Sequence, residues 1–201
     1  MNFRFTTTTL GLLLCASASA VQFGAGVDYG FNKVEITDKD FNRFASTHKV
    51  TSNPIQLHLE ARHMFKVNKD FKLSIQAEVM KSLDENLDVY QNQINLKQDY
   101  SFGVNLQPTY TFSGKTSAYM NVGVHFAPIK YTDTYRMTET KANMIGPKVG
   151  LGVSHKLAKR VSASAKYSVF MPLKETIKAS DKKDQINIMH QTIGAGLQFA
   201  I

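Results

Sequence analysis

The sequence predicts an all-β fold: an eight-stranded antiparallel up-and-down β-barrel that spans a membrane. Eight segments alternate apolar and polar side chains with a period of two, which is the pattern of strands and not of helices. The connections between them alternate between short turns and long polar segments, as in small outer-membrane barrels. No apolar run approaches the roughly 18 to 20 residues of a membrane-spanning helix, so strands would have to cross the membrane.

The first 20 residues have the composition of a secretory signal peptide. Arg4 supplies the positive charge, an apolar stretch follows, and the small residues 18–20 match a cleavage site. We therefore expect residues 1–20 to be removed and residues 21–201 to form the barrel. Cys15 is the only cysteine of the chain, so the mature protein would contain no disulfide.

Each segment reaches the roughly 9 to 11 residues that a tilted strand needs to cross a bilayer. The predicted strands, in chain order, span residues 21–33, 54–67, 71–81, 100–112, 117–127, 144–157, 161–171 and 188–201. Their apolar faces hold, in the same order, Val27 and Phe31, Leu57 and Leu59, Leu73 and Ile75, Val104 and Leu106, Val122 and Val124, Val149 and Leu151, Ala165 and Tyr167, and Ile193 and Leu197. Pro108 cannot donate a ladder hydrogen bond, so we expect a bulge or kink in the fourth strand.

The connections predict which end of the barrel faces which compartment. Residues 68–70, 113–116 and 158–160 read as tight turns, and short turns face the periplasm in such barrels. We therefore expect three short periplasmic turns and four long extracellular loops. The loops are the polar segments 34–53, 82–99, 128–143 and 172–187.

The polar faces are expected to point into the lumen. They are rich in glycine, and the lumen of eight strands is only wide enough for side chains to fill. Aromatic residues of the apolar face gather near the strand ends, as in the girdles of a membrane barrel. The charged residues of the polar face balance and would have to pair if enclosed. This lumen charge network comprises Asp28, Glu60, Arg62, Glu78, Lys148 and Lys166.

No catalytic, cofactor or metal site is predicted. The mature chain has no cysteine nucleophile, and the lumen carboxylates have basic partners available. His58, His125 and His190 face the lumen and favour hydrogen-bonded histidines, although a three-histidine metal site is conceivable. A net charge of +8 does not indicate nucleic-acid binding, since no groove combines basic and aromatic residues. The excess charge lies at the short-turn rim, where anionic phospholipid head groups would meet it.

The chain resembles the small eight-stranded outer-membrane barrels, namely the outer-membrane protein A barrel domain and the opacity-protein and related adhesin barrels. Its last residues, Gly196-Leu197-Gln198-Phe199-Ala200-Ile201, are similar to the terminal strand that the barrel-insertion machinery reads. Gly196, Phe199 and Ile201 would form this signal, although the commonest form ends in Phe. The resemblance implies a monomeric barrel in the outer membrane of a Gram-negative envelope.

The expected function is non-enzymatic: an envelope-structural role, surface adhesion through the extracellular loops, or both. The expected partners are lipopolysaccharide, inner-leaflet phospholipid, the insertion machinery and a host or surface protein; no cofactor is expected. Aromatic residues could anchor a loop partner, or pack loop on loop above the barrel. These candidate loop contacts are Phe41, Phe44, Tyr90, Tyr131 and Tyr135. The alternatives are a lipid A-modifying enzyme of the same shape and a soluble lipocalin-like carrier. The absence of tryptophan removes the usual opening motif of lipocalins.

Overall fold

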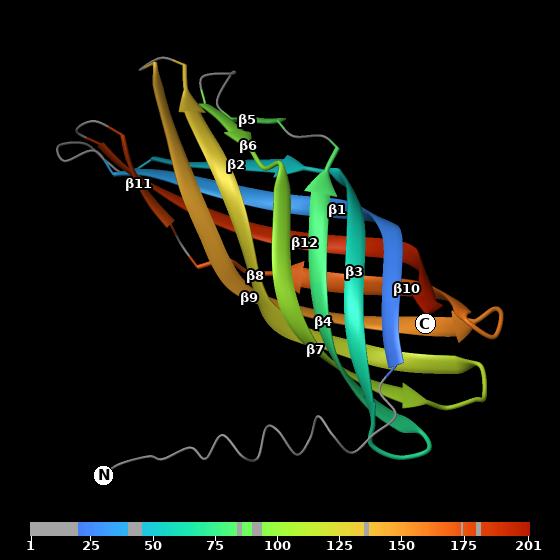
Figure 1. Ribbon diagram of the computed structural model, residues 1–201. Helices are drawn as coiled ribbons and strands as arrows, with labels where there is room; N and C mark the ends of the chain where they lie inside the picture. The colour runs from blue at the N-terminus through green and yellow to red at the C-terminus, as the bar shows by residue number, and fades with distance from the viewer. Residues whose placement is uncertain are drawn as a thin grey trace, which may run out of the picture.

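The structure, a computed structural model, is a closed antiparallel β-barrel (Figure 1). It describes residues 20–39, 46–83, 86–89, 94–134, 137–173, 175–179 and 182–201. Eight strands form the ring, and β12 pairs with β1 to close it. In ring order they are β1 (Ala20–Lys39), β3 (Ile55–Lys66), β4 (Phe71–Ser82), β7 (Tyr100–Thr111), β8 (Thr116–Asp133), β9 (Thr138–Lys156), β10 (Val161–Phe170) and β12 (Lys182–Ala200). The predicted fold class is confirmed.

Apolar side chains point outward through most of the barrel wall, as predicted. Leu59 is 63% exposed and its neighbour Glu60 only 7%. Val104 and Asn105 on β7 repeat the contrast, at 58% and 1%. Such a surface would be costly in water but suits hydrocarbon. Among the described residues, no helix is long and apolar enough to cross a membrane.

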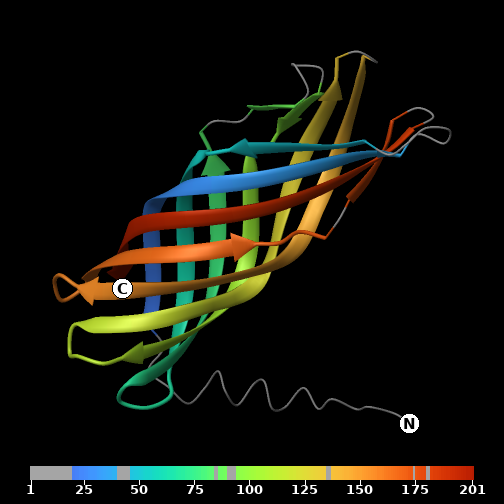
Figure 2. The same ribbon diagram turned by 180° about the vertical axis from the view of Figure 1, so that it is seen from behind.

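Four strands continue well beyond the ends that the sequence analysis assigned to them. In Figure 1, β8 and β9 rise above the rest of the wall, while β1 and β12 extend together to one side. Figure 2 shows the same extension from behind. Short strands pair within it: β2 (Ser46–Ser52) on β1, β11 (Glu175–Ala179) on β12, and β5 (Asn86–Val89) beside β6 (Ile94–Lys97), which pairs with β8. Much of the predicted long loops is therefore sheet.

The alternation of side chains inverts where the strands enter this extension. On β1 the outward positions change from Phe31 to Lys33 and Glu35, and the inward positions become Val34 and Ile36. Inward apolar residues of the neighbouring strands join these two in one buried cluster. Its other members are Leu96, Ala127, Ile129, Tyr131, Ala142, Met144, Phe170, Ile186 and Ile188.

The extension therefore has the polarity of a water-soluble barrel, with an apolar interior and a charged exterior. On its outer face, the hydrogen bond from Lys49, whose Nζ lies 3.3 Å from the Glu35 carboxylate, lowers the pKa of that carboxyl below its usual value. The loop prediction was wrong for these segments because it followed their mean polarity. Their period-two pattern continues with the two faces exchanged.

Pro108 interrupts the ladder between β7 and β8 without shifting it. The pairs Leu106 with Val122 and Thr109 with Tyr119 lie on either side of the gap and belong to one register. No residue is inserted, so the expectation of a bulge was wrong. Pro108 remains opposite Leu73 on β4. The missing N–H therefore leaves a local gap on one side of β7.

Polar side chains on the outer face of the wall have local partners. Tyr167 donates a hydrogen bond to the amide oxygen of Gln191 over 2.9 Å. His155 Nδ1 lies 2.9 Å from the Thr116 hydroxyl, and the His63 ring packs edge-on against Phe65. These contacts reduce the cost of placing polar groups at the lipid side.

We predict that Val104→Arg, in the middle of β7, lowers the free energy of unfolding by about 2–4 kcal/mol, because the charge would face the hydrocarbon midplane. The matched control is Leu157→Arg beside a short turn, where the cost should be about 0–1 kcal/mol. Urea unfolding in lipid vesicles measures both. Equal losses at the two positions would contradict this orientation of the barrel.

Candidate functional site

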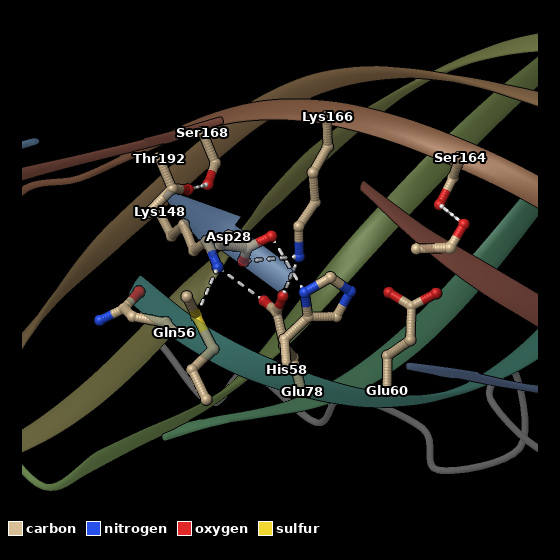
Figure 3. Close-up of polar contacts among 12 residues, drawn as sticks. Asp28, Gln56, His58, Glu60, Glu78, Lys148, Ser164, Lys166, Ser168 and Thr192 are labelled. Carbon is tan, nitrogen blue, oxygen red and sulfur yellow. Dashed lines mark hydrogen bonds and ion pairs between the residues drawn. The ribbon is translucent and has the colours of Figure 1, made fainter. Parts of the chain in front are cut away.

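The centre of the lumen is organised around one carboxylate, Glu78 on β4. Its two oxygens each accept a hydrogen bond from a lysine: Oε2 from Lys148 on β9 and Oε1 from Lys166 on β10, both over 2.6 Å. Figure 3 shows the two ammonium groups converging on this carboxylate from the opposite wall. Lys148 also lies 3.3 Å from the Met80 sulfur. The contacts tie β4 across the lumen to strands on the far side of the ring.

Lys166 extends the network to β1 and β3. Its Nζ lies 3.3 Å from Asp28 Oδ2, and His58 Nδ1 lies 2.9 Å from Asp28 Oδ1 (Figure 3). The neighbouring strand leaves room for this carboxylate because it carries glycine there. A Cβ at Gly194 would collide with the Asp28 carboxylate.

A second cluster lies on β3 and β4, closer to the short turns. The Glu60 carboxylate accepts hydrogen bonds from Arg62 and from the Gln76 amide, both over 2.5 Å. The Arg62 guanidinium also lies over the Tyr119 ring, 5.9 Å from its centroid. Tyr119 in turn fills the space that Gly152 leaves, since a Cβ there would collide with its ring.

The two clusters place all six predicted charged residues in ion pairs, and none of the six is more than 8% exposed. Three carboxylates face three cations, so the lumen is formally neutral. Burying an isolated charge costs several kcal/mol, and pairing with hydrogen bonds offsets that cost. The sequence analysis did not include Gln76 or His58 in this network, although both lie at lumen-facing positions of their strands.

The three lumen histidines contact different polar partners. His58 contacts Asp28. His125 Nε2 lies 3.2 Å from the Asn105 amide oxygen and 3.6 Å from Glu78. His190 contacts Asn32 and lies 3.0 Å from the Gln56 amide oxygen. Within the described residues, no group of three or more His, Cys, Asp or Glu side chains could hold a metal ion.

Of the five candidate loop contacts, the structure describes the position of Tyr131 alone; Phe41, Phe44, Tyr90 and Tyr135 lie outside the described residues. Tyr131 is fully buried on β8, within the apolar cluster of the extension. Its position points inward, so for Tyr131 the structure shows packing above the barrel, the second of the two roles left open for these aromatic residues.

The terminal strand closes the barrel. Phe199 lies opposite Phe23, Gly196 lies opposite Gly26, and the Ile201 N–H donates to the Val21 carbonyl over 3.0 Å. These contacts describe the seam of the folded barrel. The role of Gly196, Phe199 and Ile201 as an insertion signal stays a prediction.

We predict that Glu78→Gln destabilises the barrel by about 3–5 kcal/mol, because buried Lys148 would lose its counter-charge and Lys166 would keep only Asp28. The double variant Glu78→Gln with Lys148→Met should recover part of the loss, since it removes one orphaned cation. The control is Glu139→Gln. Its ion pair with Lys130 is exposed, and such pairs contribute about 0–1 kcal/mol. Chemical unfolding in detergent micelles compares the variants; a Glu78→Gln loss no larger than that of Glu139→Gln would rule out the network as a stabilising element.

Solved structures share this fold at low sequence identity. The outer membrane protein OprG from Pseudomonas aeruginosa aligns with a TM-score of 0.60 and 12% identity, over 91% of this chain and 96% of that one. The outer membrane protease OmpT from Escherichia coli aligns at 0.56 and 6%, over 90% and 97%. Neisserial surface protein A aligns at 0.52 and 15%, over 88% and 96%. At these identities the likeness concerns the fold.

Sequence comparison gives the family. No curated protein matches the sequence. The profile of the family described as outer membrane protein beta-barrel domain matches residues 6–199, which is nearly the whole chain. The protein therefore belongs to the outer membrane protein beta-barrel domain family.

Proposed function

We propose that this outer-membrane barrel is a non-enzymatic envelope protein whose wall and lumen serve a structural role and whose extension presents a surface for attachment. The observation that carries the structural part is the ring of contacts around Glu78. It joins β4, β9, β10 and β1 through buried ion pairs. Cross-lumen pairs of this kind favour one rigid arrangement of the strands over an open pore.

The enzyme alternative has one relative in its favour, since OmpT is described as a protease. In this chain the three lumen carboxylates are at most 7% exposed and each lies in an ion pair. A general base must reach a substrate proton directly or through one water. Buried and paired carboxylates do not offer that access, which favours the non-enzymatic function.

The hairpin of β8 and β9 is the element that favours attachment. Its strands stay paired up to Asp133 opposite Thr138, and β6 pairs with β8 along the same stretch. A sheet therefore extends beyond the barrel wall. Met137, near the tip, is 95% exposed and has a φ of 50°. An exposed apolar side chain on a paired sheet suits a protein contact, because little entropy is lost on binding.

Lipopolysaccharide is the lipid partner that the outer face suits. Lys97, Lys130 and Lys141 lie directly opposite one another on β6, β8 and β9. They stand just beyond Tyr100, Phe102 and Phe126, where the outer face changes from apolar to charged. Lys130 pairs with Glu139 and Lys97 with Asp99. Phosphate groups at the membrane surface would add counter-charge to this row of three ammonium groups.

Deleting the gene and restoring it in two forms tests this proposal. One form is the full chain; the other replaces residues 132–139 by a tight Asn-Gly turn, which leaves the lumen network intact. Both forms should restore resistance to detergent and to large antibiotics, because the barrel wall carries the structural role.

The two forms should differ in attachment, since the shortened hairpin should abolish binding of the bacteria to cells or to matrix proteins. Lipid A from deleted and restored strains should have the same mass spectrum. A change in the lipid A spectrum would establish the enzyme alternative, and failure of both forms to restore resistance would refute the structural role.

A further inference from the structure

The periplasmic mouth of the barrel is a basic basin of about 350 Å³. Strands and short turns from around the ring line it, at the end where the turns and the C-terminus lie in Figure 2. Its rim holds six cationic side chains, and none of the described residues that line it is acidic. The six are Lys66, Lys72, Lys115, Lys156, Lys159 and Arg160.

Three of these lysines belong to the lumen face and not to the lipid face. Lys66 continues the inward positions of Arg62 and Met64 on β3, Lys72 shares the inward face of β4 with Ser74, and Lys156 follows Ser154 on β9. Their ammonium groups therefore surround the opening. A phospholipid head group in the surrounding leaflet meets the outer wall, so these lysines are placed for a ligand that approaches along the barrel axis.

The basin is electrostatically unfavourable when empty. Lys66 and Lys72 lie directly opposite each other across the β3–β4 pair, and like charges in that position destabilise a sheet. No described acidic residue forms an ion pair with either of them. An oxyanion between the two ammonium groups would turn this repulsion into attraction.

The floor of the basin supplies hydrogen-bond donors. Arg62, Ser74 and Gln198 line it and are 7%, 1% and 4% exposed. Hydroxyls of Ser154 and Ser162 stand around them. A concave site with cations and hydroxyl or amide donors, and without carboxylates, is complementary to an anion rich in acceptor oxygens.

We infer that the periplasmic mouth is a binding site for a phosphorylated ligand with several negative charges, which enters from the periplasmic end and contacts Lys66, Lys72 and Lys156. A carboxylate has fewer acceptor oxygens and less negative charge than a phosphate monoester. A single monovalent anion would leave most of the rim lysines without a counter-charge. The phosphates can belong to a free solute or to a lipid head group that reaches into the mouth.

Calorimetric titration of the folded barrel with inorganic tripolyphosphate tests the inference, in nanodiscs of zwitterionic phosphatidylcholine. We expect saturable one-to-one binding that weakens as salt screens the charges. Lys72→Gln and Lys156→Gln should each reduce the affinity about threefold or more, as expected for the loss of one partly exposed ion pair. The matched control is Lys69→Gln, in the turn that precedes β4 and Lys72; it removes the same charge from a residue that does not line the basin.

Stability of the unliganded protein separates loss of the site from loss of the fold. Lys72→Gln relieves the repulsion with Lys66, so unfolding should shift to equal or higher denaturant concentration while affinity falls. Absence of tripolyphosphate binding, or an equal loss of affinity in Lys69→Gln, would overturn the inference.

Repeating the titration in nanodiscs that also contain phosphatidylglycerol identifies the source of the phosphate. If the phosphate of the natural ligand belongs to a free solute, the tripolyphosphate affinity of the parent protein divided by that of Lys72→Gln stays unchanged. For a lipid head group that occupies the basin, that ratio falls toward one. Both results require a phosphate site at these lysines.

Discussion

The width of an eight-stranded lumen is the constraint on which the rest of this structure depends. Such a lumen has room for side chains and little else, so the charged groups that point inward pair with one another. Glu78 meets two lysines at once, and Asp28 fits because Gly194 has no side chain. The glycines and the charged residues of the inner face both follow from this limited space, because small residues on one strand make room for charged side chains on the next.

The same strands pass through two environments along their length, the membrane and water. Within the membrane the outer face is apolar and the lumen holds paired charges; beyond it the outer face is charged and the interior holds Val34, Ile129 and Ile186. A period-two strand can change in this way without changing its conformation, since only the identity of the two faces is exchanged. The level of exchange marks the outer boundary of the hydrocarbon on the protein itself. It also places an apolar cluster beyond the charged one along the barrel.

The sequence was sufficient to predict the eight strands, their lumen faces and the six charged residues. Alternate residues of a strand face the lumen and the lipid, so the position of a residue in the alternation indicates which of the two it meets. Partners were harder to predict. Lys148 and Glu78 are far apart in the chain, and their contact follows from the ring order and from the stagger of the strands, which periodicity does not encode. Tyr131 and the other residues of the extension were misassigned because their segments are polar on average. The partners of Gln76 and His58 in this network were not predicted, because a balance of formal charges counts only the carboxylates, lysines and arginines.

The two ends of the barrel differ for an electrostatic reason. The lumen charges neutralise one another internally, so they leave nothing to offset charges at the mouth. At the extracellular end, carboxylates such as Glu35 and Glu139 lie beside the outer-face lysines. At the short-turn end, seven cations line a concave opening, and only Arg62 among them has a carboxylate partner among the described residues. None of the described residues that line this opening is acidic. Field lines concentrate in such an opening because the barrel wall and the surrounding lipid have a low dielectric constant. A lumen whose charges pair with one another therefore leaves the positive charge of this mouth uncompensated, and that charge attracts anions toward the short-turn end of the barrel.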